Sequence, residues 1–260
     1  MILILGNASD NLLYLKTMLR QGKEEKECRG AFSSYSGKLY GQDVMLVETG
    51  YSSYRSEALT SYLLARYQPY FVIYLGDAMK ISPNMQIGDI ILPDAVQIVD
   101  VNELARDTSY HLNEVPGFPS VMTVVPTVRE LFLNAAADVQ ILNIIRALVI
   151  SANSIPQSMN DLPSFDYNSF KAANTEEVAY ESEIGGVALS AALQGVSFMP
   201  VLAVSTDINV PSSILERKKT VLRTSIDIGK MVIAFIAAIS SNENRFIRGD
   251  EFKADKRLKF

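Results

Sequence analysis

The sequence is poor in the side chains that build disulfides and metal sites. Its 260 residues include one cysteine, Cys28, and one histidine, His111. A single cysteine excludes an internal disulfide framework, and one histidine leaves no His/Cys cluster with the spacing of metal ligands. The sequence therefore predicts no metal and no cofactor, and it argues against a histidine-based catalytic triad.

Long apolar runs and an excess of positive charge are also missing. No apolar run approaches the ~20 residues that cross a bilayer. The formal net charge is −5 with mixed signs, which gives no basic footprint for nucleic acid. The N-terminal MILILGNASD lacks the basic region and the cleavage site of a signal peptide. We expect a cytoplasmic protein with no membrane and no nucleic-acid partner, whose ligand is a small molecule.

Short apolar runs are what the chain does contain, and they alternate with segments of helical period. Several runs lack polar alternation, which is typical of strands buried on both faces. The strand-like runs are 1–5, 44–48, 70–76, 89–100, 147–151 and 198–205, and the helical segments are 55–66, 126–138, 184–195 and 213–240. A hairpin over 34–49, with its turn at Gly41-Gln42, adds an antiparallel pair. This order predicts an α/β fold, three-layer αβα with a central mixed β-sheet.

The domain organisation follows from the same pattern. With 48% apolar residues and no interrupting linker, residues 1–240 are long enough to form one domain with a full core. The segment 241–260 is charged and lacks a long apolar period, so we expect a solvated C-terminal extension.

Polar residues follow several of the expected strands, at the ends where ligands bind in such folds. These places are Gly6-Asn7, Gly50 to Ser53, Gly76-Asp77, Ser151 to Asn153 and Ser205 to Asp207. In VAYESEIGG, strand alternation places Glu181 and Glu183 on one face. Two carboxylates at the edge of a core require a structural partner or a ligand.

The order of these motifs resembles the purine nucleoside phosphorylase and nucleosidase superfamily, and within it the 5′-methylthioadenosine/S-adenosylhomocysteine nucleosidase branch. The match covers residues 1 to about 240. Gly88-Asp89-Ile90 is similar to the Val-Gly-Asp-Ile that follows the family's Gly-Ser-Ala-Gly turn, and VPGFP (115–119) is similar to its Pro-Gly-x-Pro loop. YESEIGGVA resembles the Val-Glu-Met-Glu-Ala signature, and AVSTD resembles Ile-Ser-Asp.

The resemblance implies hydrolysis of the N-glycosidic bond of a purine nucleoside, in a homodimer. Glu183 matches the glutamate that grips the ribose 2′- and 3′-hydroxyls, and Asp207 matches the aspartate that delivers a proton to purine N7. We expect desolvation to raise the pKa of Asp207. Further substrate-binding residues implied by position are Glu181, Ser182, Tyr51, Gly76, Ser151, Asn153, Ile155 and Phe118, the last in the loop that closes the neighbouring subunit's pocket in dimeric members.

The sequence departs from the family where water is activated. The family glutamate after the first strand aligns with Asn11, whose amide does not accept that proton. Asp77 replaces the serine of the Gly-Ser-Ala-Gly turn, so our hypothesis is that Asp77 is the general base, with Asp10 the lesser candidate.

Two alternatives to hydrolysis remain open. One is a nucleoside-binding protein that has lost catalysis, which Asn11 and Ser182 favour. The other is a phosphate-dependent phosphorylase. The position two residues before the Gly-Ser turn, an arginine in phosphorylases, is Tyr74, and Asp77 would repel phosphate. Arg55 and Arg217 are the arginines from which an anion site would be rebuilt.

Overall fold

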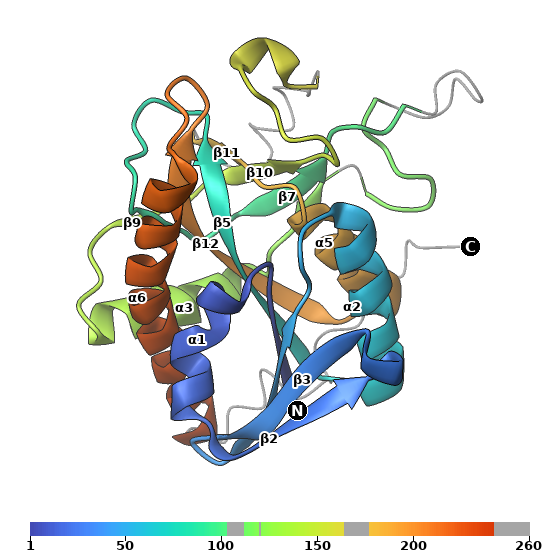
Figure 1. Ribbon diagram of the computed structural model, residues 1–260, viewed down its shortest axis with the longest axis vertical. Coiled ribbons are helices and arrows are strands. Elements are labelled where there is room, and N and C mark those ends of the chain that lie inside the picture. Colours follow the sequence, from blue (N-terminus) through green and yellow to red (C-terminus); the bar gives the residue numbers. More distant parts are fainter. Residues whose placement is uncertain (103–111, 120, 164–176, 242–260) are drawn as a thin grey trace.

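The computed structural model describes residues 1–102, 112–119, 121–163 and 177–241 (Figure 1). The strands are β1 (Ile2–Gly6), β2 (Arg20–Glu27), β3 (Phe32–Leu39), β4 (Gln42–Glu48), β5 (Phe71–Lys80), β6 (Ile90–Ile91), β7 (Ala95–Ile98), β8 (Met122–Thr123), β9 (Ile144–Ile145), β10 (Leu148–Ser151), β11 (Val178–Tyr180) and β12 (Ser197–Asp207). The helices are α1 (Ser9–Met18), α2 (Ser53–Tyr67), α3 (Pro126–Asp138), α5 (Ile184–Gln194) and α6 (Ile214–Ser241), with short 3₁₀ turns at Cys28–Gly30 and Met159–Asp161.

The strands form one mixed sheet built around β5. The main path runs β2-β3-β4-β1-β5-β11-β10-β7-β8, and β12 also pairs with β5. Strands β4, β1, β5 and β12 are mutually parallel, whereas β11 runs antiparallel to β5. The carboxyl ends of β1, β4, β5 and β12 therefore meet at one edge, and β11 brings the residues that follow it back to that edge.

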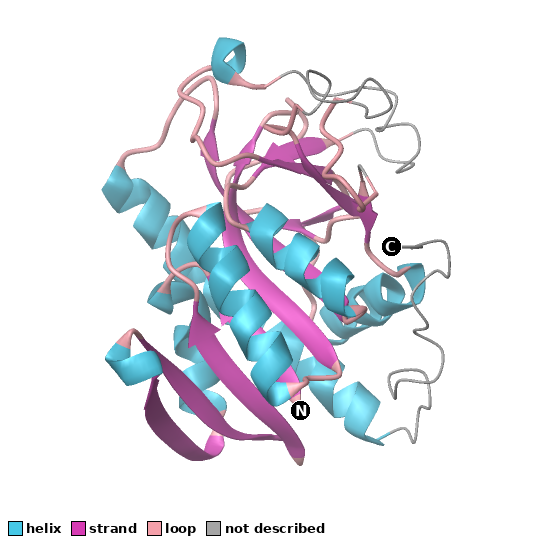
Figure 2. Ribbon diagram, turned by 90° about the vertical axis from the view of Figure 1, so that its right-hand side faces the viewer, coloured by secondary structure: helices cyan, strands magenta, loops and turns pink. Residues whose placement is uncertain are grey.

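Helices cover both faces of the sheet. Helices α1, α3 and α6 pack on one face, and α2 and α5 pack together on the other (Figure 1). Figure 2, turned toward the α2 and α5 side, shows these helices in front of the strands. Every residue of β1 is buried, as is β5 from Phe71 to Ala78. The predicted three-layer αβα architecture with a central mixed sheet is confirmed.

The expected helices agree with α2, α3, α5 and α6 to within a few residues. The expected strand 89–100 is divided, because Pro93 lacks the N–H that a continuing strand needs, and β6 and β7 lie on either side of it. The hairpin turn is Tyr40-Gly41, one residue earlier than predicted. Both residues have positive φ, 48° and 84°, as a type I′ turn requires.

Helix α1 and strand β2 were not expected from the sequence. Strand β2 reads RQGKEEKE and is exposed over all but its last residue, so no apolar pattern marks it. Its charges suit an edge strand, where they discourage pairing with other chains. His111 and the extension over 242–260 lie outside the described residues. Within the described ranges, none of the helices has the length and apolar character that spanning a membrane requires.

Candidate functional site

Three acidic side chains, from two parts of the chain, line a small cavity at the carboxyl edge of the sheet. The cavity, of about 30 Å³, is bounded by Asp77, Met79, Ile155, Tyr180, Glu181, Ser182, Glu183, Thr206 and Arg217. The antiparallel pairing of β11 with β5 brings the 181–183 segment next to Asp77. Tyr180 lies opposite Met79, and the chain that follows Tyr180 runs back along β5. Asp77, Ile155 and the 181–183 segment, all predicted from the sequence, are thus brought together.

The two glutamates differ in what they contact. Glu181 is fully enclosed: Oε1 accepts the Tyr74 hydroxyl at 2.9 Å, and Oε2 accepts the backbone N–H groups of Glu183 and Ile184. Its carboxylate therefore caps the start of α5. Burial, then the nearby charge of Glu183, raises the pKa of Glu181 well above its ordinary value. These contacts make Glu181 a support for the start of α5, and its substrate-binding role stays a prediction.

The Glu183 carboxylate is held by Ser52, at the start of α2, and by its neighbour Ser182. Its Oε1 accepts the backbone N–H of Ser52 at 3.1 Å and the hydroxyl of Ser182 at 2.6 Å. Ser52 has a φ of 99°, which is uncommon for a residue with a side chain and persists only where the surrounding structure holds it. This strained turn at the start of α2 points an N–H at the Glu183 carboxylate and fixes its orientation.

Two glycines let α5 start directly behind Glu183. A Cβ on Gly186 would lie 2.5 Å from the carbonyl oxygen of Ser53, and one on Gly185 would lie 2.9 Å from Ser151 Oγ. Helices α2 and α5 therefore approach closely only because Gly186 lacks a side chain, and Gly185 lets α5 approach β10 in the same way. The close approach holds Ser52 within hydrogen-bond distance of Glu183.

Asp77 lies at the centre of a buried hydrogen-bond network. Its Oδ2 accepts Arg217 Nε at 2.6 Å and Ser205 Oγ at 2.7 Å, and its Oδ1 accepts Asn7 Nδ2 at 3.1 Å. Asn11 in turn donates to Asn7 Oδ1. Asn11 thus orients the carboxylate indirectly, through the amide of Asn7.

A β-bulge delivers one of these donors. Strand β12 pairs with β5 in register up to Val204, and pairing resumes at Thr206, which leaves Ser205 outside the ladder. Bulges re-aim side chains next to functional sites, and here the Ser205 hydroxyl meets Asp77. After the bulge, Asp207 lies opposite Lys80.

Asp207 forms an ion pair that the sequence did not predict. Lys80 Nζ lies 2.9 Å from its Oδ2, and the backbone N–H of Asn209 donates to Oδ1 at 2.8 Å. Burial raises the pKa of Asp207, but the hydrogen bonds from Lys80 and from the Asn209 backbone outweigh it, and the pKa is lowered. The expected upward shift is therefore wrong, because desolvation is opposed by a cation on the paired strand.

Asp10 and Tyr51 lie at the rim. Asp10 is partly exposed, and its Oδ2 lies 3.7 Å from Lys218 Nζ. Tyr51 is 64% exposed, and burial of its hydroxyl, followed by the charge of Asp77, raises its pKa. Both side chains are near the acidic cavity without lining it.

The residues expected to hold the base divide between two cavities. Ile155 lines the acidic cavity, whereas Ser151 and Asn153 line a neighbouring one of about 230 Å³ that α2 and α5 border. Ser151 Oγ accepts the Gly185 N–H at 3.1 Å, so it also supports α5. Phe118 is half-buried and lines neither of these two cavities. Gly76 lies on β5, with Tyr74 against its Cα.

Sequence reasoning assigned no role in the site to Lys80 or Tyr74, it indicated Asn7 only as a polar residue after a strand, and it named Arg217 only as a source for an anion site. The sequence held a signal for two of them. Asn7 follows β1 at a strand end, and Lys80 stands in the stretch that replaces the family's glycine turn. Among the described residues, no group of three or more His, Cys, Asp or Glu side chains is arranged to hold a metal ion.

Comparison with known proteins identifies relatives among the nucleosidases. A 5′-methylthioadenosine/S-adenosylhomocysteine nucleosidase from Marinomonas sp. is 26% identical over 202 residues, covering 78% of this chain and 84% of the relative. One from Geobacillus sp. (strain WCH70) is 24% identical over 204 residues, with the same coverage of both chains.

Solved structures show the same fold. The Neisseria meningitidis nucleosidase, in complex with methylthio-immucillin-A, superposes with a TM-score of 0.77 at 19% identity, covering 91% of this chain and 98% of that one. The Colwellia psychrerythraea enzyme, in complex with adenine, gives 0.76 at 19% identity over 90% and 93%. The family model described as "Phosphorylase superfamily" matches residues 1–237. With nearly the whole domain matched, the chain belongs to the phosphorylase superfamily.

Proposed function

We propose that the chain hydrolyses the N-glycosidic bond of a purine nucleoside of the methylthioadenosine or S-adenosylhomocysteine type and releases the free base. The observation that carries the proposal is the buried Glu183 carboxylate, fixed by Ser52 and Ser182 on the wall of a cavity shared with Asp77. A carboxylate held in one orientation is the acceptor that two ribose hydroxyls need. The names of the relatives from Marinomonas and Geobacillus support the substrate class.

Asp77 is our candidate for the general base that activates water. A carboxylate offers about four acceptor positions, and Asn7, Ser205 and Arg217 occupy three of them. The open position is on Oδ1, where a water within hydrogen-bond reach would be polarised for attack on C1′. Asp10 is the lesser candidate, because it lies at the rim beside Lys218.

Asp207 is our candidate for the acid that protonates N7 as the bond to C1′ breaks. Because Lys80 and the Asn209 backbone lower its pKa, the carboxyl group of the free protein is ionised near neutral pH. The proton must then reach the base through the Lys80–Asp207 pair, in which the ammonium group lies 2.9 Å from the carboxylate. Lys80 therefore becomes part of the acid in this proposal.

The remaining side chains surround the substrate in this proposal. Glu181 and Ser182 hold Glu183, Ile155 contacts the base, and Tyr51 borders the 5′ side. Gly76, Ser151, Asn153 and Phe118 keep the substrate-binding roles that the resemblance implies.

Binding without turnover is the second candidate, and Asn11 favours it. The Asn11 side chain is buried and donates to Asn7. The family position for water activation is therefore occupied by an amide, and three donors already bind Asp77. A protein of this kind would be stabilised thermally by a nucleoside and release no base.

One experiment separates these functions. The protein is incubated with methylthioadenosine, S-adenosylhomocysteine, adenosine and inosine, with and without phosphate, and free base is measured by chromatography. Base release that does not depend on phosphate supports hydrolysis. Release only with phosphate replaces it with phosphorolysis, and thermal stabilisation without release leaves a binding protein.

We also propose a homodimer that acts in the cytoplasm in purine salvage. The loop that holds Phe118 supports this proposal, because Phe118 lies outside both site cavities of its own subunit and its backbone N–H is bonded to Val115, which lines the larger one. A second subunit would cover that open cavity. Light scattering after size-exclusion chromatography measures the mass, and a monomer at all concentrations would contradict the dimer.

A further inference from the structure

Arg217 places a positive charge with unused donors at the acidic cavity. It lines that cavity, its Nε is bonded to Asp77 Oδ2 at 2.6 Å, and its side chain is 40% exposed. Within the described part of the chain, no protein atom accepts a hydrogen bond from its outer nitrogens Nη1 and Nη2. The guanidinium group therefore keeps N–H donors that a ligand in the cavity can use.

Asp10 supplies a negative charge at the same part of the rim. It lies in the first turn of α1, and its side chain is 28% exposed. Its Oδ2 lies 3.7 Å from Nζ of Lys218, the residue that follows Arg217 on α6. That distance is longer than a hydrogen bond, so the carboxylate retains acceptor positions for a ligand.

The Tyr51 side chain is the common neighbour of these charges. Its hydroxyl interacts electrostatically with Asp77, Arg217, Glu183 and Asp10, and the residue is 64% exposed. The proposed function places Tyr51 at the 5′ side of the nucleoside, so Arg217 and Asp10 also border that side. A thioether sulfur packs favourably against an aromatic ring such as that of Tyr51.

The balance of charge at this rim discriminates between 5′ substituents. The acids outnumber the cations, since Asp77, Glu183 and Asp10 face Arg217 and Lys218. A substituent with only negative charge would add to this excess, and a plain alkyl group would cover the outer donors of the guanidinium without accepting from them. A zwitterion adds no net charge and offers one group to each of the two rim residues.

We propose that Arg217 and Asp10 bind the amino-acid end of a homocysteinyl 5′ substituent, Arg217 through its carboxylate and Asp10 through its ammonium group. The guanidinium fork matches a carboxylate in bidentate geometry. This inference rests on the proposed function, because it needs a nucleoside whose ribose is held at Glu183. It makes S-adenosylhomocysteine, rather than methylthioadenosine, the preferred substrate.

Four thioether nucleosides that differ only in the 5′ substituent test the proposal on the full chain. They are S-adenosylhomocysteine, its analogue without the amino group, its analogue without the carboxylate, and methylthioadenosine. The kcat/KM for base release is measured by chromatography, and Kd is measured by calorimetry for any compound that is not cleaved. We expect S-adenosylhomocysteine to exceed methylthioadenosine about 10-fold or more, and each singly charged analogue to lose most of that gain.

Two variants assign the gain to residues. The readout is the ratio of S-adenosylhomocysteine to methylthioadenosine within each variant, so a general loss of turnover from disturbing Asp77 cancels. Arg217→Gln should bring S-adenosylhomocysteine down to its analogue without the carboxylate, and Asp10→Asn should bring it down to the analogue without the amino group. The matched controls, Lys219→Gln on the exposed side of the same turn and Asp138→Asn at the exposed end of α3, should keep the wild-type ratio.

Misfolding of Arg217→Gln, which leaves the buried Asp77 without its cation, does not remove the test. The four compounds report on the wild-type protein, and Asp10→Asn changes a partly exposed residue. A wild-type ratio in Arg217→Gln or in Asp10→Asn overturns the inference. An analogue without the carboxylate that equals S-adenosylhomocysteine also overturns it, without any variant.

The outcome also separates this inference from the function on which it rests. If all four compounds are cleaved equally well, hydrolysis stands and recognition of the amino-acid end fails. If S-adenosylhomocysteine binds more tightly than methylthioadenosine in an Arg217-dependent way and no base is released, the recognition stands and hydrolysis fails. If none of the compounds binds, both fail.

Discussion

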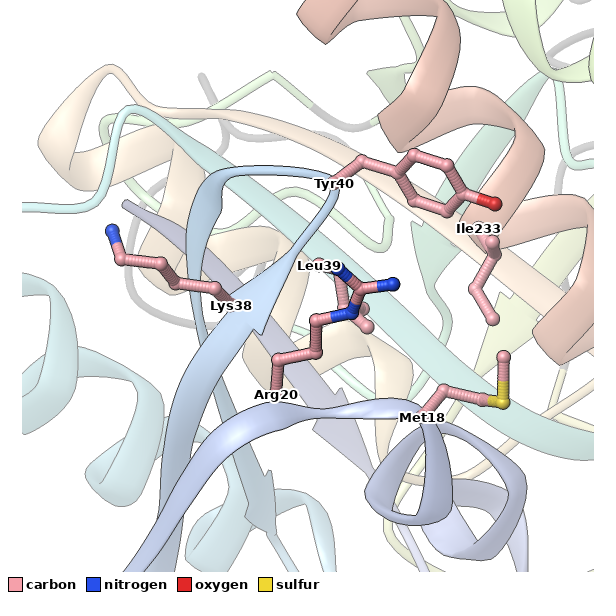
Figure 3. Close-up of a pocket in the computed structure, with 6 residues that line it drawn as sticks. All are labelled: Met18, Arg20, Lys38, Leu39, Tyr40 and Ile233. Atoms are coloured by element: carbon pink, nitrogen blue, oxygen red, sulfur yellow. The ribbon is translucent and has the colours of Figure 1, made fainter.

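Two cavities at opposite ends of the sheet differ in size and in what lines them. The one at the amino end is lined by Met18, Arg20, Lys38, Leu39, Tyr40 and Ile233 and measures about 260 Å³, against about 30 Å³ for the acidic one (Figure 3). In Figure 3, Lys38 points away from Met18 and Ile233, and its ammonium group is instead paired with the exposed Asp43 at 2.7 Å.

The acidic cavity is smaller, but the fold fixes the positions of its acidic groups through hydrogen bonds. Asp77, Glu181 and Glu183 are buried, and each is bonded to donors from distant parts of the chain. Burying a carboxyl group without such partners costs several kcal/mol. Three buried carboxyl groups in one place therefore call for a functional explanation, whereas an open pocket with solvated cations does not. Buried, oriented charge indicates the functional site better than volume.

The largest expected effect is on Asp77. Asp77→Asn keeps the shape and the hydrogen bond to Ser205 but removes the acceptor for a proton. General base catalysis contributes about 10²- to 10⁴-fold, so kcat for base release should fall about 1000-fold. The protein should remain folded by circular dichroism. A variant with wild-type base release would remove Asp77 from the mechanism and leave Asp10 to be tested in the same way.

Glu183→Gln should reduce kcat/KM for base release about 100-fold. The amide accepts less strongly than the carboxylate, and hydrogen bonds to a charged group are worth about 1.5–3 kcal/mol each. The matched control is Glu130→Gln, which changes an exposed glutamate on α3 that lines neither of the two site cavities. Equal losses in the two variants would contradict the ribose-binding role of Glu183.

Lys80→Met should reduce the free energy of unfolding near neutral pH by about 1 kcal/mol, the value of a partly exposed ion pair. The pKa of Asp207 is lowered from 3.8, so its contribution is present above that pH and lost as pH falls through the folded pKa. Urea unfolding at neutral and acidic pH should show a smaller acid loss in the variant. An unchanged acid loss would mean that Lys80 does not control Asp207.

Glu181→Gln should change how the free energy of unfolding depends on pH more than it changes the magnitude of that free energy. The pKa of Glu181 is raised from 4.5, so the folded state holds a proton that the unfolded chain has lost, and wild-type stability falls as pH rises above 4.5. Glutamine does not titrate and still accepts the N–H bonds at the start of α5. The stability of the variant relative to wild type should therefore increase with pH. A constant difference from acidic to alkaline pH would show that Glu181 is ionised in the fold.

The smallest effect should come from the amino-end cavity. Arg20→Gln and Lys38→Gln change exposed charges, for which stability effects stay within about 0.5 kcal/mol. Base release should be unchanged in both. A loss of activity in either would overturn the contrast between the two cavities.

The sequence predicted the fold class and most of the strands because buried runs such as that of β5 need no tertiary information to be recognised. It also located Asp77, Glu181 and Glu183, since polar residues directly after strands lie at one edge of a parallel sheet. Strand β2 could not be predicted, because an edge strand with charged residues on both faces has no apolar pattern.

The pairings within the site were also beyond sequence reasoning. Lys80 meets Asp207 only because a one-residue bulge at Ser205 shifts the register of β12 on β5. The pKa of Asp207 depends on that contact, and burial alone predicts the opposite sign. A partner 127 residues away in sequence, as Lys80 is from Asp207, becomes visible only in three dimensions.

The two amides next to Asp77 have a consequence for proton transfer. In the chain from Asn11 to Asn7 to Asp77, each amide nitrogen donates to the next oxygen. Amide groups keep their hydrogens at ordinary pH. This side of the carboxylate is therefore polar but does not conduct protons. If Asp77 is the general base that we propose, the proton that it takes from water cannot leave through Asn7 and Asn11, so its exit is confined to the side of the carboxylate that faces Ser205, Arg217 and the cavity.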